Sequence, residues 1–306
     1  MMKILRNPES TRPCVLVLGM FDGVHRGHQK LLMKGVELSE EHRLPLVVCT
    51  FDPHPLKVLR PEIAPPLLTT LTERAQIMAT FGVDCFCINR FTREVADQHY
   101  EEYLADLVRT YQPQYVVCGY NFTFGKGGEG DADVLEASGM VYGYETHIVP
   151  EVVLEGGAVS STRIRALLSE GDVRTVNRLL GHAYTLSGRV VDGKHIGRTL
   201  GFPTANVDIP RGKALPAYGV YACWLQDGTR SYPAVVNVGR HPTLPEGSVT
   251  VEAYVLDADL QLYGRKVRLQ LLHYLRSEQR FESVDALRER IAADAQECRE
   301  YFASIQ

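Results

Sequence analysis

Two histidines three residues apart stand at the start of a predicted helix. They belong to the stretch Gly19-Met-Phe-Asp-Gly-Val-His-Arg-Gly-His28, which follows the apolar run 14–18. Apolar residues then recur at helical spacing from about residue 27 to residue 41. A helix N-terminus carries unpaired N–H groups and about half a positive charge, so it attracts phosphate. We therefore expect His25 and His28 to face a bound anion together.

Imidazole groups at a phosphate site can donate hydrogen bonds to the charge that grows in a transition state. The pattern predicts a site that holds the phosphates of a nucleotide while the α-phosphorus is attacked. Gly23 and Gly27 would let the backbone approach the phosphates closely. The alternative is a pair of structural or solvated histidines, but strand, loop, paired histidines and helix seldom occur in this order by chance.

A second anion site is indicated at Val159-Ser-Ser-Thr-Arg-Ile-Arg165. Ser160 or Ser161 can cap a helix, which would turn N–H groups and hydroxyls toward an anion. Thr162 and Arg165 are three residues apart and share a helical face. Arginine suits bidentate binding of phosphate oxygens. The alternative is an ordinary N-cap with surface arginines.

Strand and helix patterns alternate through the first half of the chain, which favours a parallel sheet with crossover helices. Buried strands are predicted at 14–18, 44–51, 84–89, 115–119 and 145–150. Ligands of such sheets bind outside the carboxyl ends of the strands, so we expect the exit of the second strand to border the histidine site. The residues there are Phe51, Pro53, His54 and Pro55. A rigid turn is the alternative.

A glycine-rich loop with aromatic residues follows the fourth strand, from Cys118 to Gly130. Aromatic rings offer a stacking surface for a flat ligand. Phe122 and Phe124 would be costly to expose on a loop that has no partner. The alternative is a low-complexity surface loop.

The pattern changes after Tyr184. Short segments rich in Val and Tyr, separated by Gly, Pro and Asp, indicate an antiparallel sheet or a small barrel. We place the domain boundary at residue 183, which gives domains 1–183 and 184–306. Apolar residues at helical spacing in 283–302 predict an amphipathic helix that covers the barrel.

The loop from Asp192 to Asn206 has no Walker A pattern, yet its glycines and cations could form a nest of N–H groups around phosphates. The candidate phosphate-binding residues are Gly193, Lys194, Gly197 and Arg198. Thr204 and Asn206 alternate onto one face and could supply oxygen ligands to Mg²⁺. A long barrel loop is the alternative.

Glu252 is the candidate base of the second half. Its neighbours Val251, Ala253 and Val255 are apolar, so strict alternation turns Glu252 to the other face. A carboxylate that points into the mouth of a small barrel could act as general base for an alcohol that attacks a γ-phosphate. The alternative is a solvated strand residue.

Size and composition favour a two-domain globular protein: 306 residues, 45% hydrophobic and 23% charged. We expect no membrane span and no signal peptide. Seven cysteines without a CxxC pair indicate reduced core residues of a cytoplasmic protein. The net charge is −4, and neither half is basic enough to predict nucleic-acid binding. We expect a monomer or weak self-association.

The motifs GMFDGVHRGH, FDPHP, CGYNFTFG and SSTRIR, in this order, resemble those of the bacterial bifunctional riboflavin kinase and FAD synthetase family, within the nucleotidylyltransferase superfamily. The resemblance implies a Rossmann-like parallel sheet that transfers AMP from ATP to FMN, giving FAD and pyrophosphate. It implies catalytic roles for His28 and Arg165. The implied ATP-binding residues are Gly19, Phe21, His25, His28, Ser161, Thr162 and Arg165. The implied flavin-binding residues are Phe51, Pro53, His54, Pro55, Asn121 and Phe124.

In the second half, GRTLGFPTAN, GVY, NVGRHPT, VEAYVLD and LYGRKV resemble the riboflavin kinase domain of the same family. The resemblance implies a six-stranded barrel with a terminal helix that phosphorylates the riboflavin 5′-hydroxyl. It places Thr204 and Asn206 at Mg-ATP, Glu252 as base and Arg280 on the flavin side. Tyr254 stands where the family often has histidine, which leaves the base unaffected.

Two other functions fit parts of the sequence. A single-activity adenylyltransferase for another phosphate acceptor would keep the barrel as a passive domain and would bind no flavin. A flavin-sensing regulatory protein would bind its ligands without turnover, and its His28, Arg165 and Glu252 would be replaceable by alanine.

Overall fold

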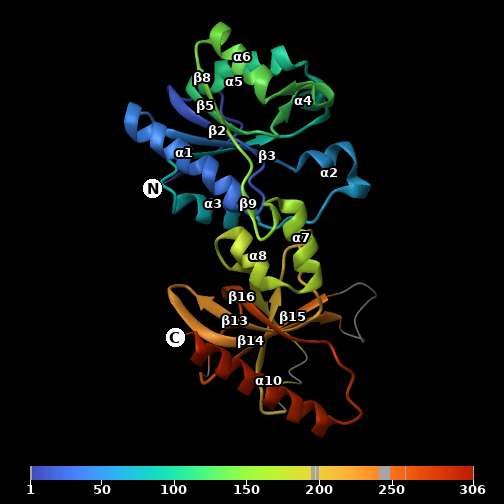
Figure 1. Cartoon of the computed structure of the whole chain (residues 1–306). Helices are drawn as coiled ribbons and strands as arrows, with labels where there is room; N and C mark the ends of the chain where they lie inside the picture. Colours follow the sequence, from blue (N-terminus) through green and yellow to red (C-terminus); the bar gives the residue numbers. More distant parts are fainter. Residues whose placement is uncertain (1, 194–196, 198–199, 241–248, 259, 306) are drawn as a thin grey trace. The chain divides into compact units, whose positions relative to one another are not determined.

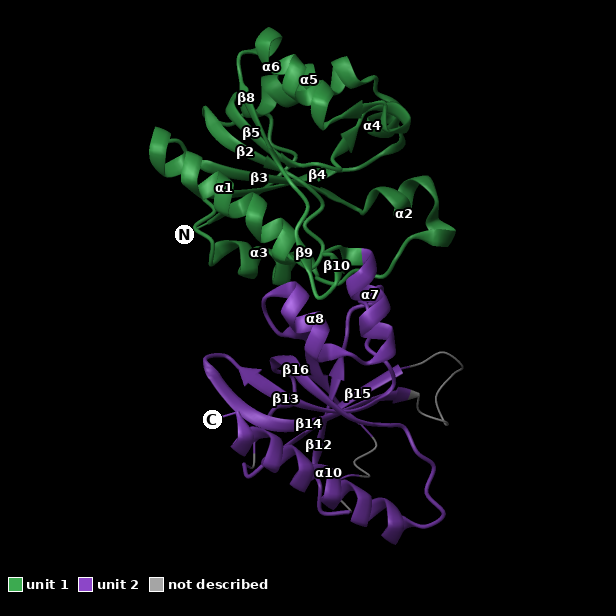
Figure 2. Cartoon of the chain, viewed as in Figure 1, with its two compact units in different colours: residues 1–161 green, residues 162–306 purple. Residues whose placement is uncertain are grey.

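The computed structural model describes residues 2–193, 197, 200–240, 249–258 and 260–305. The chain divides into two compact units, residues 1–161 (unit 1) and 162–306 (unit 2), as Figure 2 shows. The division assigns the whole of the segment 162–183 to unit 2. Residue 183 as the boundary between two functional domains stays a prediction.

Unit 1 contains a six-stranded parallel sheet with strand order β1-β4-β3-β2-β5-β8. Its strands are β1 (Lys3–Arg6), β2 (Cys14–Leu18), β3 (Leu46–Asp52), β4 (Cys85–Arg90), β5 (Pro113–Gly119) and β8 (Glu145–Val149). The parallel sheet and the five strands predicted for it, β2, β3, β4, β5 and β8, are confirmed. The edge strand β1 was not predicted, because all four of its residues are exposed and show no buried pattern.

Helices cover both faces of this sheet (Figure 1). On one face, α1 (Arg26–His42) and α3 (Leu71–Ala79) pack on a cluster that includes Val15, Val17 and Phe86. On the other face, α5 (Tyr100–Tyr111) and α6 (Ala132–Tyr142) pack on Leu16 and Cys87. The shorter elements are α2 (Pro55–Leu59), η1 (Pro61–Ile63), α4 (Arg93–Asp97), β6 (Thr123–Phe124), η2 (Lys126–Gly128), β7 (Gly130–Asp131), β9 (Val153–Leu154) and β10 (Gly157–Ala158).

Unit 2 contains a closed barrel with strand order β11-β12-β15-β14-β13-β16. Its strands are β11 (Tyr184–Val191), β12 (Thr204–Asp208), β13 (Gly219–Asp227), β14 (Arg230–Arg240), β15 (Val249–Val255) and β16 (Lys266–Ser277). The six-stranded barrel predicted from the sequence is confirmed.

The helices described in the rest of the chain after β10 are α7 (Ser161–Glu170), α8 (Val173–Leu180) and α10 (Val284–Ser304). The predicted terminal helix is α10, which runs along the barrel in Figure 1. Its residues Ala295, Cys298 and Phe302 form a buried cluster with Val220 and Val235 of the barrel. The amphipathic pattern of the sequence therefore reflects packing.

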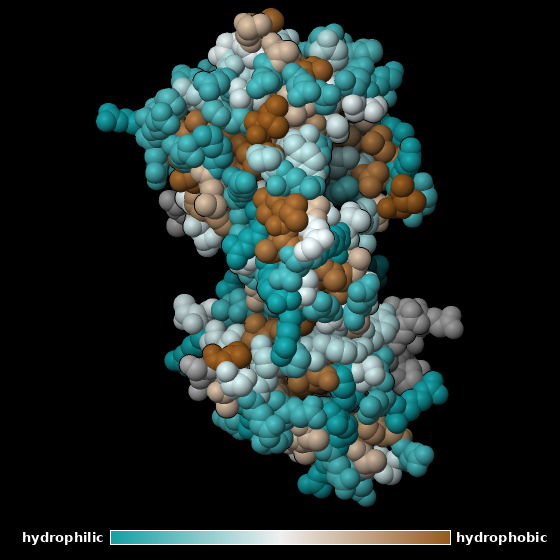
Figure 3. All heavy atoms as spheres, in the orientation of Figure 1, coloured by the Kyte–Doolittle hydropathy of each residue, from teal (hydrophilic) through white to brown (hydrophobic). Residues whose placement is uncertain are grey.

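The molecular face in Figure 3 is largely hydrophilic, with hydrophobic residues in small separate groups. Among the described residues, no helix combines the length and the hydrophobicity that crossing a bilayer requires.

Candidate active sites

His25 and His28 of unit 1 meet at the N-terminus of α1. His25 is the N-cap residue, and its Nδ1 accepts a hydrogen bond of 3.3 Å from the backbone N–H of His28. The two rings stack, with centroids 3.7 Å apart and planes 16° from parallel. The predicted pairing at a helix N-terminus is therefore present, and its backbone N–H groups suit an anion.

His28 carries a buried ring nitrogen. Its Nδ1 has no hydrogen-bond partner among the residues that the structure describes. Burial, followed by the nearby His25 and Arg74, lowers the pKa of His28 well below 6.5. His28 is therefore neutral at pH 7, and one ring nitrogen of a neutral imidazole can donate a hydrogen bond to an anion without a charge of its own.

A buried ion pair fixes the loop that leads to these histidines. The Asp22 carboxylate accepts hydrogen bonds of 3.0 Å from the backbone N–H groups of Leu68 and Thr69. Arg74 lies 3.5 Å from the same carboxylate and donates to the Met20 carbonyl oxygen at 2.9 Å. Both charged side chains are 2–3% exposed. Sequence reasoning missed Asp22 and Arg74, although a charged residue among the apolar positions of α3 was a possible signal.

Ser161 joins the second predicted anion motif to the first. Its Oγ donates a 2.8 Å hydrogen bond to the backbone carbonyl oxygen of Asp22, within unit 1. Thr162 and Arg165 lie on the first turns of α7, in unit 2. Their action on the same phosphates as His28 stays a prediction.

Gly19 and Phe21 lie on the histidine loop, as predicted. The backbone of Phe21 has φ = 52°, in the left-handed region, and its ring lies 5.2 Å from the ring of His28. A side chain at Gly19 would meet the Phe21 ring at 3.1 Å. Gly19 therefore makes room for Phe21, whose ring packs beside His28.

The predicted flavin side of unit 1 begins where β3 ends. Phe51 packs edge-on against Phe91, with ring centroids 5.2 Å apart. The Asp52–Pro53 peptide bond is cis, and His54 caps α2 by accepting a 3.2 Å hydrogen bond from the Leu56 N–H. Pro55 is the first residue of α2. These positions form a defined turn, and their contact with flavin stays a prediction.

The aromatic loop after β5 differs from the expected open stacking surface. The Phe124 side chain is buried, with ring centroids 5.7 Å from Phe122 and 5.3 Å from Tyr103. Phe124 therefore packs against other aromatic residues of unit 1, and its side chain is not exposed to solvent. Asn121 is exposed on the same loop. The structure therefore offers Asn121, rather than the face of Phe124, to a ligand.

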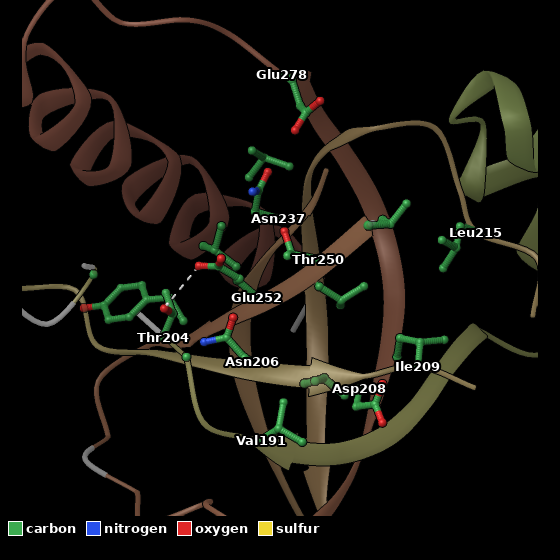
Figure 4. A pocket seen from close by; sticks show the side chains of 18 of the residues that line it. Val191, Thr204, Asn206, Asp208, Ile209, Leu215, Asn237, Thr250, Glu252 and Glu278 are labelled. Carbon is green, nitrogen blue, oxygen red and sulfur yellow. Dashed lines mark hydrogen bonds between the residues drawn. The ribbon is translucent and has the colours of Figure 1, made fainter. Parts of the chain in front are cut away.

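Unit 2 contains a cavity of about 1200 Å³ lined by strand, loop and α10 residues. The predicted residues Gly193, Gly197, Thr204, Asn206 and Glu252 all line it. Thr204 Oγ1 donates a 3.4 Å hydrogen bond to Glu252 Oε2, drawn as the dashed line in Figure 4. Asn206 faces Glu252 directly across β12 and β15. The structure therefore brings together the predicted base and both predicted metal ligands.

The position of this cavity corrects one expectation. Glu252 shares its face of β15 with Tyr254, which packs against the cluster that contains the α10 residues Ala295 and Cys298. The apolar neighbours Val251 and Ala253 are buried on the opposite face. Glu252 therefore points to the outer, α10-facing side and not into the mouth of the barrel, because a six-stranded barrel is filled by its own side chains.

Gly193 and Gly197 are needed for close packing. A side chain at Gly193 would collide with the Asn206 amide, and one at Gly197 would collide with the Phe202 carbonyl oxygen. Lys194 and Arg198 lie outside the described residues. Arg280 is exposed just after β16, next to the cavity residues Gln279 and Phe281.

Sequence reasoning missed other polar residues of the cavity. Asn237 on β14 pairs with Glu252, which extends the polar row to a third strand (Figure 4). Lys213 is 7% exposed, and its Nζ lies 4.8 Å from the centre of the Tyr184 ring. Asn237 was recognisable as the polar residue of the segment VVNVG, whereas nothing local marked Lys213 as buried.

Two family models match the chain. One, described as FAD synthetase, matches residues 7–163, and the other, described as riboflavin kinase, matches residues 180–302. The chain therefore contains a module similar to FAD synthetase followed by a module similar to riboflavin kinase.

Complete relatives carry both modules. The bifunctional riboflavin kinase/FMN adenylyltransferase of Escherichia coli strain K12 is 39% identical over 292 residues, covering 94% of this chain and 93% of that protein. The protein of the same description from Bacillus subtilis strain 168 is 32% identical over 304 residues, covering 97% and 95%. This chain belongs to the bifunctional riboflavin kinase/FMN adenylyltransferase family.

A solved structure shares the whole fold. A Streptococcus pneumoniae protein described as a macrolide-efflux protein is 30% identical, with a TM-score of 0.88, covering 97% of this chain and 99% of that one. The likeness extends to both units.

Proposed function

We propose that the barrel of unit 2 phosphorylates riboflavin to FMN with ATP, and that the His25–His28 site transfers AMP from a second ATP to FMN, giving FAD and pyrophosphate. Membership of the bifunctional family supports both activities. The observation that carries the kinase assignment is the convergence of Thr204, Asn206 and Glu252 in one cavity.

In the kinase step, Glu252 takes the proton of the riboflavin 5′-hydroxyl as the oxygen attacks the γ-phosphorus of ATP. The Thr204 hydrogen bond orients the carboxylate. Asn206, directly opposite Glu252, holds the phosphate end of ATP within reach. The glycines at 193 and 197 keep the neighbouring loop close to these side chains.

The donors in this cavity fit Mg²⁺. Hydroxyl, amide and carboxylate oxygens lie side by side on β12 and β15, and hard oxygen donors of this kind suit Mg²⁺ better than zinc. We propose Thr204 and Asn206 as its protein ligands. Mg²⁺ supplies charge neutralisation of the ATP phosphates when bound.

In the adenylyl transfer step, an FMN phosphate oxygen attacks the α-phosphorus and pyrophosphate leaves. The nucleophile is already an anion, so no base is needed and positioning dominates. The N-terminus of α1 attracts the phosphates, and neutral His28 donates a hydrogen bond to charge that grows on them. We propose that Thr162 and Arg165 complete this site from α7, and that Asn121 and His54 border the flavin.

We further propose that the chain acts in the cytoplasm, without nucleic-acid partners, as a monomer or weakly associating species. All seven cysteines are free thiols, which supports a reducing compartment.

The two reactions leave different products of ATP: the kinase step leaves ADP, and adenylyl transfer leaves pyrophosphate. We expect ADP to form only when riboflavin is present, and pyrophosphate to form when FMN is supplied alone. Pyrophosphate released with FMN in the absence of riboflavin supports adenylyl transfer in its own right. ADP formation that does not depend on riboflavin would contradict the kinase assignment.

A further inference from the structure

Two cysteines of β4 lie in direct contact, outside both proposed sites. The sulfur atoms of Cys85 and Cys87 are 3.6 Å apart and share a hydrogen bond. The two residues are two apart on one strand, so their side chains point to the same face of the sheet. We propose that Cys85 and Cys87 form a reversible oxidation site, which reacts with peroxides to give an intrastrand disulfide.

The two thiols differ in access. Cys85 is half-buried at the first position of the strand, whereas Cys87 is fully buried. Cys85 pairs with Lys3 of the exposed edge strand β1, which places a cation nearby. An oxidant can therefore reach Cys85 first, while Cys87 is held beside it.

The pKa values of the two thiols also favour reaction of Cys85 before Cys87. The hydrogen bond from Cys87 is the main cause that lowers the pKa of Cys85, with a further contribution from Lys3. The same hydrogen bond, together with burial, raises the pKa of Cys87. Because the thiolate is the reactive form, Cys85 is the sulfur that attacks the peroxide. Cys87 is the thiol that then reacts with oxidised Cys85.

The chemistry balances in two steps. The Cys85 thiolate attacks one oxygen of hydrogen peroxide, which breaks the O–O bond, gives a sulfenic acid and releases hydroxide. The Cys87 sulfur then attacks the Cys85 sulfur, and the sulfenic oxygen leaves as water with the Cys87 proton. Peroxide is reduced to water, and two thiols are oxidised to one disulfide.

The strand geometry permits this bond. A strand rises about 3.3 Å per residue, so residues two apart have Cα atoms about 6.6 Å apart, inside the upper limit of about 6.8 Å for disulfides. The sulfur atoms need to approach from 3.6 Å to about 2.0 Å. Dithiothreitol should restore both thiols, since a bridge near this limit is readily reduced.

The other buried cysteines provide an internal comparison. Burial raises the pKa of Cys118 to about 12 and that of Cys14 to about 12. Both side chains are fully buried. We expect them to react with peroxide far more slowly than Cys85.

Mass spectrometry of the full-length protein tests the proposal. Trypsin cleavage after Arg74 and Arg90 isolates residues 75–90, whose only cysteines are Cys85 and Cys87. After hydrogen peroxide, denaturation, alkylation and digestion, we expect this peptide to lose both alkylation sites and to be two hydrogens lighter than the reduced peptide. Dithiothreitol before alkylation should restore both sites.

Two variants sharpen the result. Cys87→Ser should give sulfinic or sulfonic acid at Cys85 instead of the bridge, and Cys85→Ser should leave Cys87 reduced. The proposal is overturned if, in the peroxide-treated parent protein, peptide 75–90 keeps two alkylatable thiols at a peroxide dose that already oxidises Cys14 and Cys118. It is also overturned if Cys87→Ser leaves the product at Cys85 unchanged.

Discussion

Thr204 donates a hydrogen bond across two neighbouring barrel strands to Glu252, with 3.4 Å between Oγ1 and Oε2. Strand register sets this contact, because β12 and β15 are antiparallel neighbours and Asn206 faces Glu252. The same register places Asn237 of β14 on the other side of the carboxylate. The cavity thus contains an oriented carboxylate beside hydroxyl and amide oxygens.

Glu252→Gln should abolish the kinase step selectively. The amide cannot accept the proton of the attacking hydroxyl, so we expect FMN formation from riboflavin to fall by about 10²–10⁴-fold. Conversion of supplied FMN to FAD should continue at the parent rate. Glu289→Gln, at an exposed position of α10, is the matched control and should leave both rates unchanged. Equal loss of both activities in Glu252→Gln would contradict the assignment.

Thr204→Val should weaken ATP binding in the kinase step. Valine keeps the shape of threonine but removes the hydroxyl that bonds Glu252 and faces the proposed metal. We expect a higher KM for ATP and a lower kcat, whereas Thr204→Ser should keep most of the activity. Chelation of divalent cations by EDTA should stop FMN formation in the parent protein, and added Mg²⁺ should restore it. FMN formation that persists in EDTA argues against the metal site.

Arg74→Met should destabilise unit 1 without affecting the barrel. Removal of one partner of a buried ion pair costs about 3–5 kcal/mol, because the Asp22 carboxylate stays buried without its cation. The single tryptophan, Trp224, lies on β13 and contacts Phe302 of α10, so its fluorescence reports unfolding of the barrel. With urea, FMN adenylylation should fail at lower concentration in the variant, while the fluorescence midpoint stays in place. A matching shift of both midpoints would count against this interpretation.

His28 should make the stability of unit 1 depend on pH. Its pKa in the folded protein lies well below the ordinary value of 6.5, chiefly because of burial. The unfolded chain therefore binds the proton more readily, and stability is lost as the pH falls below about 6.5. Between pH 7.5 and pH 5.0, the parent should lose more stability than His28→Gln, measured by urea unfolding followed by far-ultraviolet circular dichroism. An equal loss in the two proteins would show that His28 does not contribute.

Much of this architecture was predictable because its signals are local. Buried strands such as 14–18 are continuous apolar runs, and the capping box of Thr70 and Glu73 is present at the start of α3, where each side chain bonds the backbone N–H of the other residue. The exposed edge strand β1 carries no such pattern, since pairing with β4 alone defines it.

The site residues that the sequence did not predict depend on long-range contacts. Asp22 and Arg74 are 52 positions apart, and only the packing of α3 brings them together. The alternation of apolar and polar residues in β15 correctly predicted that Glu252 lies on the opposite face from Val251 and Ala253. It did not predict which of the two faces borders the cavity, because that depends on the packing of α10. Phe124 looked exposed in a glycine-rich loop, yet the core contacts of Phe122 and Tyr103 bury it.

The central claim is that one chain performs both reactions in sequence. The most direct test is a time course of the purified protein with riboflavin, ATP and Mg²⁺, in which riboflavin, FMN and FAD are separated by chromatography. We predict that FMN appears first and that FAD follows from it. FMN without FAD would contradict adenylyl transfer, FAD formed only from supplied FMN would contradict the kinase, and neither product would contradict the account as a whole.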